Sequence, residues 1–246
     1  MKISVITVCY NSEENIATCL DSYASQTYSD KELIVIDGAS TDRTLSIVQR
    51  YRPERLVSER DKGLYYALNK GVTFATGDVV CFLHSDDVFG SPNVLENIAS
   101  IFEKYNTDSV YADLQYVSKN DISHVVRNWH SGKFTQNGLR RGWMPPHPSF
   151  FVKKSVYERY GLFDTRYKIA ADYDIMMRFL GKYRISTAYC PIVAVKMRVG
   201  GASNRSLKNI ILKTKEDFLI ARANNIGGLF TVVCKNFRKL NQFCAK

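Results

Sequence analysis

Short runs of β-branched and apolar residues alternate with helical patterns along the first 90 residues, and this alternation constrains the fold most. The apolar runs occupy residues 2–8, 32–37, 54–59 and 78–83. Between them lie helical patterns, one from a capping pair, Asn11 and Glu14, to about Ser25, then 41–51 and 63–75. Apolar runs of this length are typical of strands buried on both faces. The alternation therefore predicts an α/β fold with a doubly wound, mostly parallel sheet.

The second half of the chain has a less regular pattern. It predicts helices over 92–105, 172–182 and 206–225, and strands over 108–117 and 185–199, the last broken at Pro191. The final helix has an apparent apolar stripe made of Ile210, Ile211, Thr214, Phe218 and Ala221. Residues 118–148 are polar, aromatic and rich in Gly and Pro, so we interpret them as a long loop or hairpin region.

The chain has 246 residues and a formal net charge of +10, which indicates an anionic partner: a phosphorylated substrate, a membrane surface or a nucleic acid. It contains no Lys/Arg-rich run and no nucleic-acid motif, so nucleic acid is disfavoured. The cysteines show no CxxC spacing, which favours free thiols in a reducing compartment. The N-terminus lacks a signal-peptide pattern, and no run of 18 apolar residues occurs. We therefore expect a cytoplasmic protein without a membrane span.

Polar side chains gather where each of the four predicted strands ends. They are Thr7 and Tyr10 at the first, Asp37 and Asp42 at the second, Arg60 and Asp61 at the third, and His84, Ser85, Asp86 and Asp87 at the fourth. Each one taken alone is typical of a loop. Because the carboxyl ends of parallel strands meet at one edge of a sheet, together they predict a ligand site there.

The adjacent carboxylates Asp86 and Asp87 allow two interpretations. Surface loops often carry such a pair without any function, whereas a divalent cation would offset the repulsion between the two charges. The chain has neither GxGxxG after the first strand nor a GxxxxGK[ST] motif, which disfavours a dinucleotide site and a P-loop. A diphosphate bound here would need another cation, and two carboxylates at a strand end can hold Mg²⁺ or Mn²⁺.

Five segments carry a family resemblance: "ISVITVCYN", "IVIDGASTDRT", "DKGLYYALNKGVTFATGD", "FLHSDD" and "AADYDIMMR". In this order they resemble glycosyltransferase family 2, the inverting enzymes with a GT-A fold, over roughly residues 2–200. The stretches "SERDKGLYYALNKG", "MPPHPSFF" and "VGGASN" further resemble bacterial members that build O-antigen, capsule or exopolysaccharide repeats. The resemblance implies a nucleotide-sugar donor, which we expect to be a UDP-sugar.

The resemblance also implies roles for the residues at the strand ends. The donor nucleotide would be bound by Thr7, Tyr10, Asp37, Asp42, Arg60, Asp61, Ser85 and Asp86. Asp86 matches the last acid of the family's DxD motif and would coordinate Mn²⁺ or Mg²⁺. His84 stands where the family usually has the first Asp, so Asp87 is the second candidate metal ligand.

Asp172 matches the aspartate of the family's "ED" motif, which here reads "AD" because Ala171 replaces the glutamate. The resemblance implies that Asp172 is the base that deprotonates the acceptor hydroxyl. A plain N-cap at the start of a helix is the alternative. Candidate acceptor or loop residues are Trp143, His147 and Arg198, although Trp143 is equally explained by core packing and the loop after Arg198 by a simple turn.

These expectations divide the chain into a GT-A domain, 1–205, and a basic helical extension, 206–246. Within the domain, 1–90 would bind the nucleotide and 91–205 the acceptor, a lipid-linked saccharide of bacterial surface polysaccharide synthesis. Residues 208–246 contain eight Lys/Arg and two acids, a net charge of 8 − 2 = +6. This extension either lies on an anionic membrane surface, at the inner face of the cytoplasmic membrane, or is a packed helix with a solvated basic face.

Two other functions remain open from the residues. A sugar-nucleotide nucleotidyltransferase uses a similar sheet, but it requires a glycine-rich basic loop after the first strand, where this chain has "CYNSEEN". A nucleotide-binding module that has lost catalysis is the other alternative, because His84 and Ala171 depart from the family pattern.

Overall fold

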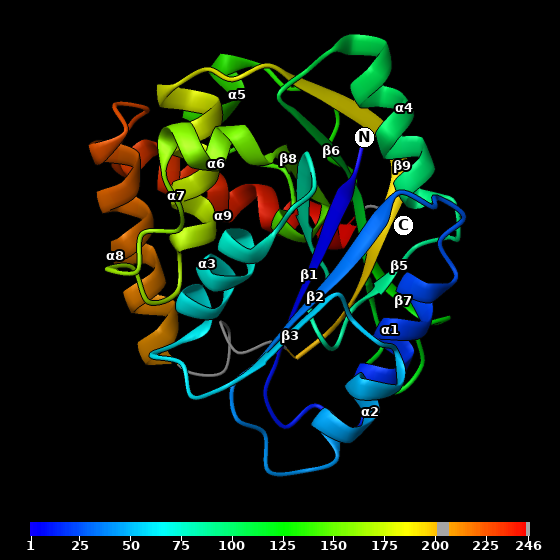
Figure 1. Cartoon of the computed structure of the whole chain (residues 1–246). Coiled ribbons are helices and arrows are strands. Elements are labelled where there is room, and N and C mark those ends of the chain that lie inside the picture. Colours follow the sequence, from blue (N-terminus) through cyan, green and yellow to red (C-terminus); the bar gives the residue numbers. More distant parts are fainter. Residues whose placement is uncertain (201–206, 245–246) are drawn as a thin grey trace.

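The computed structural model describes residues 1–200 and 207–244 and places their strands in one mixed sheet (Figure 1). The order across the sheet is β3-β2-β1-β4-β8-β6-β9-β5, and β7 pairs with β6 outside this path. The strands are β1 (Ile3–Cys9), β2 (Lys31–Asp37), β3 (Arg55–Ser58), β4 (Val79–Phe82), β5 (Val88–Phe89), β6 (Ser109–Val117), β7 (Val125–Trp129), β8 (Phe150–Lys153) and β9 (Thr187–Arg198).

The first four strands of this order are parallel to one another. β1 pairs with β2 and β4, and β2 pairs with β3. The connections between them contain the helices α1 (Ile16–Ala24), α2 (Thr44–Arg50) and α3 (Leu64–Phe74). Parallel neighbours need such crossovers, so the strand–helix alternation in the sequence is the pattern of this half of the fold. The α/β prediction is confirmed.

The sheet separates two hydrophobic cores. On one face α3 packs on β1 and β2, with Ile6 and Phe82 in the core beneath it. On the other face α1, α2 and α4 (Val94–Tyr105) cover a core that contains Val5 and Leu33 (Figure 1). Gly71 of α3 lies so close to Ile6 that any side chain there would collide with it, which accounts for the glycine.

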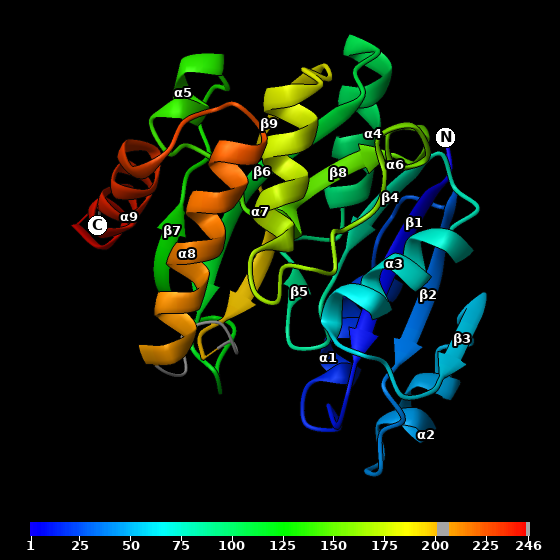
Figure 2. The ribbon, with the colours of Figure 1, turned by 90° about the vertical axis from the view of Figure 1, so that its left-hand side faces the viewer.

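The second half of the chain completes the sheet. β8 runs antiparallel between β4 and β6, whereas β6 and β9 are parallel. Its helical segments are α5 (Gln136–Arg140), η1 (His147–Ser149), α6 (Lys154–Tyr160), α7 (Ala171–Met176), η2 (Met177–Lys182), α8 (Leu207–Ala223) and α9 (Leu229–Cys244). Figure 2 shows α8 and α9 at the side of the molecule away from β1–β3. None of the described helices is both long and apolar enough to cross a bilayer.

The capping pair predicted at Asn11 and Glu14 is wrong. The helix begins only at Ile16, and Asn11 has a positive φ of 47°. Its side-chain oxygen accepts a hydrogen bond from the backbone N–H of Thr41, 2.9 Å away, so it joins two loops instead of capping a helix. The break expected at Pro191 is accommodated within β9, where the pairing with β6 shifts register between Ala112 and Leu114.

The apolar stripe predicted on the helix over residues 206–225 is also wrong. Ile210 and Ile211 of α8 are exposed, whereas Glu216 and Asp217 are buried. The physical reason is that the segment beneath α8 presents polar backbone and charged groups, which need polar partners when they are buried.

Candidate active site

A pocket of about 360 Å³ opens at the edge of the sheet where β1 and β4 end. Its walls come from the segments that follow β1, β4, β6 and β9, and it is lined by Tyr10, Asn11, Ser12, Glu14, Asn15, Ser85, Asp86, Lys119, Arg198, Val199 and Gly200. Four of the residues predicted for the site therefore come together: Tyr10, Ser85, Asp86 and Arg198. The segments are 73 to 112 residues apart where they hydrogen-bond one another, so only the fold unites them.

The loop after β1 is held by the loop after β2. Asp42 accepts hydrogen bonds from the backbone N–H groups of Glu13 and Thr44, at 3.1 and 2.9 Å. The hydroxyl of Thr44 accepts from the N–H of Ser12, and the hydroxyl of Ser12 lies 2.9 Å from that of Ser85. This network fixes the wall of the pocket. Asp42 belongs to the network but does not itself line the pocket.

Asp37, at the end of β2, is fully buried and bonded on both oxygens. Ser40 donates to it through its N–H and its hydroxyl, Ser58 donates at 2.6 Å, and the thiol of Cys9 lies 3.7 Å away. A carboxylate has about four lone-pair positions, and here protein donors occupy them. A nucleobase or ribose would have to displace one of these donors to bind Asp37.

Three further residues predicted for the donor do not line the pocket. Thr7 is fully buried within β1. Arg60 is exposed, and Asp61 forms an ion pair with Lys70 of α3 at 2.7 Å. Arg60 and Asp61 follow β3, at the far end of the sheet order from β9.

The adjacent acids Asp86 and Asp87 have opposite surroundings. Asp86 is half-buried and lines the pocket, and its backbone carbonyl accepts a hydrogen bond from the guanidinium of Arg198 at 2.6 Å. Asp87 is 1% exposed, and in the described part of the chain no hydrogen bond of normal geometry reaches its carboxylate oxygens. Burial, and then the charge of Asp86, raise the pKa of Asp87 well above its usual range.

A divalent cation fits this arrangement only together with a ligand. Within residues 1–200 and 207–244, no three His, Cys, Asp or Glu side chains gather to hold a metal by themselves. Mg²⁺ and similar ions, however, often bind through one or two carboxylates plus substrate phosphates and water. Asp86 lines the pocket as such a carboxylate, and its neighbour in the sequence, Asp87, has two buried oxygens without a hydrogen-bond partner among the described residues.

His84 connects the pocket to the start of α7. The charges of both Asp86 and Asp172 raise the pKa of His84, but burial has the larger effect and lowers it, which favours a neutral imidazole. His147 lies nearby, with its ring centroid 6.1 Å from that of His84, and burial lowers its pKa to about 4. The ring of His147 also contacts that of Phe163, with a centroid distance of 5.6 Å, and Phe163 stacks on Tyr65, which donates a hydrogen bond to Asp172.

Asp172 is half-buried in the first turn of α7. Its Oδ1 atom accepts hydrogen bonds from the hydroxyl of Tyr65, at 3.3 Å, and from the N–H of Tyr173, at 2.9 Å. The Tyr65 hydroxyl also bonds the carbonyl of Ile169 at 2.7 Å. In the described residues no hydrogen bond reaches Oδ2, so one oxygen of Asp172 is held while the other is available.

Glu216 of α8 is a residue that the sequence reasoning missed. Its buried carboxylate accepts three backbone hydrogen bonds, from Lys168, Ile169 and Ala170, at 2.8, 3.0 and 2.9 Å. These three residues lie just before Asp172 in the sequence, separated from it only by Ala171. Glu216 and its neighbour Asp217 are the two acids in residues 208–246, where all other charged residues are basic. This contrast is the sequence feature from which a role for Glu216 could have been predicted.

Two more polar contacts join the C-terminal helices to α7. Asn224, which directly follows α8, donates to Asp174 at 3.2 Å. Lys235 of α9 forms an ion pair with Asp217 at 2.7 Å, with each side chain 3% exposed. The ammonium of Lys235 also lies 3.4 Å from the ring centre of Tyr173, the residue after Asp172. The helix that carries Asp172 is therefore held from behind by α8 and α9.

Trp143 packs inside the protein and does not line the pocket. Its ring contacts Tyr111 and Phe134, each with a centroid distance of 5.4 Å. Its Nε1 atom donates to the carbonyl of Ser131 at 2.7 Å. His147 is likewise buried, against Phe82 at 5.2 Å.

Known proteins are similar to this chain in sequence or in fold. The PGL/p-HBAD biosynthesis glycosyltransferase of Mycobacterium tuberculosis (strain ATCC 25177 / H37Ra) is 32% identical over 85% of this chain and 82% of its own length. The crystal structure of Staphylococcus aureus TarS 1–349 in complex with UDP-GlcNAc matches with a TM-score of 0.69 and 19% identity over 92% of this chain. The chain spans 66% of that structure, just under two thirds.

A third match is the mannosyltransferase PcManGT of Pyrobaculum calidifontis, in complex with GDP-Man and Mn²⁺. Its TM-score is 0.63, with 19% identity over 100% of this chain and 76% of that one. These structures show the GT-A fold. The sequence model "Glycosyl transferase family 2" matches residues 4–161. The chain therefore belongs to glycosyl transferase family 2.

Proposed function

We propose that this glycosyltransferase is metal-dependent and inverting, and that it takes its sugar from a nucleotide diphosphate donor. The observation that supports this best is the series of ring contacts that runs from His84, close to Asp86 in the sequence, through His147 and Phe163 to Tyr65, which donates a hydrogen bond to Asp172. Asp86 lines a pocket beyond the carboxyl ends of parallel strands, where open α/β sheets bind their ligands. Asp172 faces the same region from α7, so a donor and a base would meet there.

The donor half of the site is residues 1–90 in this proposal. Asp86, with Asp87 behind it, would hold Mn²⁺ or Mg²⁺, and the cation would stabilise negative charge on the diphosphate leaving group. Tyr10 is 63% exposed at the mouth of the pocket and offers a face for a nucleobase. Arg198 fixes the loop that carries Asp86 by its bond to the Asp86 carbonyl, and it adds a positive charge beside the diphosphate position.

Asp172 is the proposed base. Because its Oδ1 atom is already held by Tyr65 and Tyr173, Oδ2 takes the proton from the acceptor hydroxyl. The acceptor oxygen forms a bond to the anomeric carbon from the side opposite the diphosphate, while the bond between that carbon and the diphosphate oxygen breaks. This single displacement inverts the configuration at the anomeric carbon.

The substrates belong to the proposal as well. The likeness to TarS with UDP-GlcNAc supports a UDP-sugar with a hexosyl or N-acetylhexosaminyl group, whereas PcManGT with GDP-Man makes GDP the competing nucleotide. The acceptor is a lipid-linked saccharide of bacterial surface polysaccharide synthesis, bound by residues 91–205. The positive charge of 206–246 would bring the protein to the inner face of the cytoplasmic membrane, where such acceptors lie.

Exchange of Asp172 for Asn tests the proposal against a module that binds nucleotides without turnover. Thermal unfolding is first followed with UDP, GDP, dTDP and their sugars, with and without Mn²⁺. We expect UDP compounds with Mn²⁺ to stabilise the wild type and Asp172→Asn alike, while the variant loses sugar transfer by about 10³-fold or more. Unchanged transfer would remove Asp172 as the base, and selective stabilisation by GDP or dTDP would overturn the donor assignment.

A further inference from the structure

The helix α9 turns a row of apolar side chains toward solvent. Leu229 and Phe230 are each 69% exposed, Val233 is 42% exposed and Phe237 is 64% exposed. Steps of three or four residues along a helix keep side chains on one face, so these residues form one outward row. The buried positions of the same helix include the polar residues Thr231 and Lys235. The apolar face of α9 therefore lacks a protein partner among the described residues.

A hollow of about 830 Å³ lies beside the start of α9, and its charged residues are all arginines. Its lining consists of Asn137, Arg140, Arg141, Arg222, Asn225, Ile226, Gly227, Gly228, Phe230 and Thr231. In the described part of the chain Arg140, Arg141 and Arg222 form no ion pair with an acid. Phe230 belongs both to the hollow and to the apolar row, so the two features form one surface, which we call the α9 surface.

The α9 surface is held rigidly. The hydroxyl of Thr231 donates to the carbonyl of Arg140 at 2.9 Å, and Nε of Arg238 donates to the carbonyl of Arg141 at 3.0 Å. Gly142, with φ of 73°, sits directly on the backbone of Lys235, where a side chain would collide. The backbone that carries Arg140 and Arg141 is thus held against α9, the helix that carries the apolar row.

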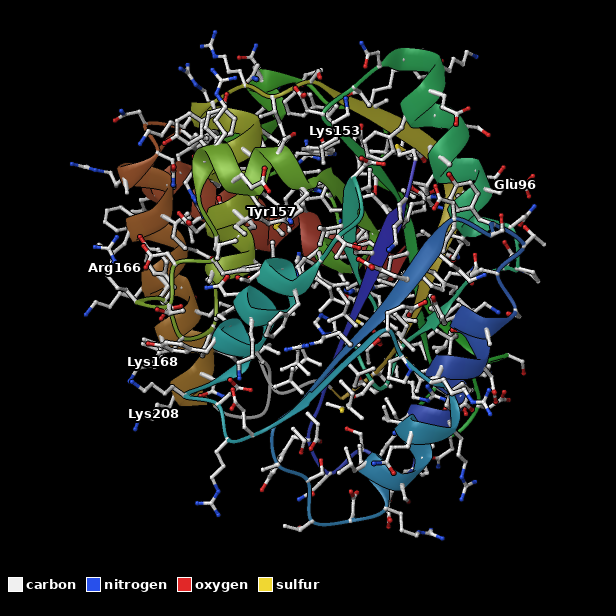
Figure 3. All side chains as sticks on the ribbon, viewed as in Figure 1. Glu96, Lys153, Tyr157, Arg166, Lys168 and Lys208 are labelled. Carbon is white, nitrogen blue, oxygen red and sulfur yellow. The ribbon has the colours of Figure 1, made fainter. Side chains whose placement is uncertain are left out.

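The neighbouring surface is also basic. Figure 3 shows Lys168 and Lys208 at the edge of the molecule formed by α8, whereas Glu96 lies on α4 at the opposite edge. Residues 1–90 contain 9 Lys/Arg and 13 Asp/Glu, whereas residues 206–246 contain 8 Lys/Arg and two acids, so an anionic surface would be attracted to the α8–α9 side first.

We infer that the α9 surface docks on an anionic lipid bilayer, with α9 in the plane of the interface. Phe230, Val233 and Phe237 would enter the boundary of the acyl chains, and the arginines of the hollow would bind headgroup phosphates. The inference assigns the membrane contact of the proposed function to a defined site. It rests on the proposed function only for the reason why the protein would bind a membrane, which is access to a lipid-linked acceptor. A protein partner would cover the apolar row but would also have to supply acids for the exposed guanidinium groups of the hollow, whereas headgroup phosphates beside acyl chains satisfy both at once.

Vesicle sedimentation with the full chain tests the inference. Vesicles of phosphatidylglycerol and phosphatidylcholine are compared with vesicles of phosphatidylcholine alone. We expect two double variants, Phe230→Ser/Phe237→Ser and Arg140→Gln/Arg222→Gln, each to weaken binding to the anionic vesicles about tenfold or more. The first removes two apolar anchors and the second removes two charges that attract the headgroups. Salt at about 0.5 M should also release the wild type from the vesicles.

Two matched variants serve as controls. Leu64→Ser/Tyr105→Ser removes exposed apolar groups elsewhere, and Arg50→Gln/Lys104→Gln removes two exposed positive charges elsewhere. We expect neither pair to change vesicle binding more than about twofold, because both lie outside the α9 surface. Equal losses for controls and test variants would overturn the site. So would equal binding of the wild type to anionic and neutral vesicles.

Two further measurements separate the remaining outcomes. Phe230→Trp should gain blue-shifted fluorescence over the wild type on anionic vesicles, a readout that does not depend on a weakened variant. Light scattering tests whether a second copy of the chain covers the apolar row. The inference would be overturned if the wild type were a dimer and Phe230→Ser/Phe237→Ser were a monomer that still bound vesicles as the wild type does. Stabilisation by UDP compounds with Mn²⁺ is measured on every variant, so a failure of the proposed donor binding is seen separately from a failure of vesicle binding.

Discussion

The carboxyl group of Asp87, the neighbour of Asp86 in the sequence, is 1% exposed, and within residues 1–200 and 207–244 no hydrogen bond of normal geometry offsets its removal from water. Its pKa in the folded chain is therefore raised, above all by burial. In the unfolded chain the group ionises near its ordinary pKa of about 3.9. The folded state binds the extra proton, so stability falls as the pH rises from the unfolded pKa to the folded pKa and stays lower above it.

Asp87→Asn should accordingly stabilise the metal-free protein at neutral pH. The amide resembles the protonated acid and never ionises, so the gain is about 1.4 kcal/mol for each unit by which the folded pKa exceeds the unfolded one. Urea denaturation at a series of pH values measures it. The gain should shrink toward zero near pH 4, at about the unfolded pKa. A constant difference across the series, or a less stable variant at neutral pH, would contradict the assigned surroundings of Asp87.

At the scale of single residues, the sequence identified Asp86 and Asp87 as candidates for the site but did not indicate where their side chains point. Asp86 and Asp87 are adjacent and chemically identical, and the position after a strand was enough to select both. The turn after β4 then directs one into the pocket and the other into the interior. Trp143 shows the same limit, because its packing against Tyr111 depends on a strand that lies more than 30 residues away in the sequence.

Among the elements, α8 supports the site although it follows the part of the chain that matches the family model. Glu216 accepts hydrogen bonds from three consecutive backbone N–H groups just before Asp172. We expect Glu216→Gln to reduce the free energy of unfolding by about 2 kcal/mol, because an amide replaces a buried charged acceptor. We also expect it to lower kcat more than tenfold while KM for the donor stays within about twofold, since Glu216 positions the base and not the nucleotide.

Two variants check this assignment of Glu216 as a positioning residue. Lys215→Gln alters an exposed neighbour on α8 and should change neither quantity. Glu216→Asp keeps the charge with a shorter reach and should recover part of the lost kcat. If Glu216→Gln is less stable but turns over at the wild-type rate, the residue supports only the fold.

Local patterns predicted the elements best where the chain is most regular. The apolar runs at 2–8, 32–37 and 78–83 contain β1, β2 and β4 nearly to the residue. The Asn11–Glu14 pair gave a wrong prediction of a helix start, because the residue types that cap helices also join loops. Only the contact of Asn11 with Thr41 shows that it joins two loops. The buried acids of α8 could not be predicted, since Glu216 has its partners 46 to 48 residues earlier in the sequence.

At the scale of the whole molecule, the pocket lined by Asp86 and the α9 surface lie in different parts of one framework. The pocket is built on the carboxyl ends of strands, and the α9 surface on helices at the side away from β1–β3 (Figure 2). Asp217 and Lys235 connect them, because this ion pair joins α8 to α9 and places the ammonium of Lys235 on Tyr173, beside Asp172. The sequence indicated a basic tail, but its attachment to α7, the helix that carries Asp172, appears only in the fold.

Lys235→Met tests whether this ion pair makes the C-terminal helices part of one cooperative structure. The substitution leaves Asp217 buried without its partner, which should cost about 3–5 kcal/mol of unfolding free energy. Asp217→Leu/Lys235→Met removes both charges and should cost only about 1–2 kcal/mol, because apolar groups of similar volume can replace a buried pair. Urea denaturation should show single transitions of similar slope for both variants. If the double variant instead loses the sum of the two single losses, or if α8 and α9 unfold in a separate step, the pair does not couple these helices to the site.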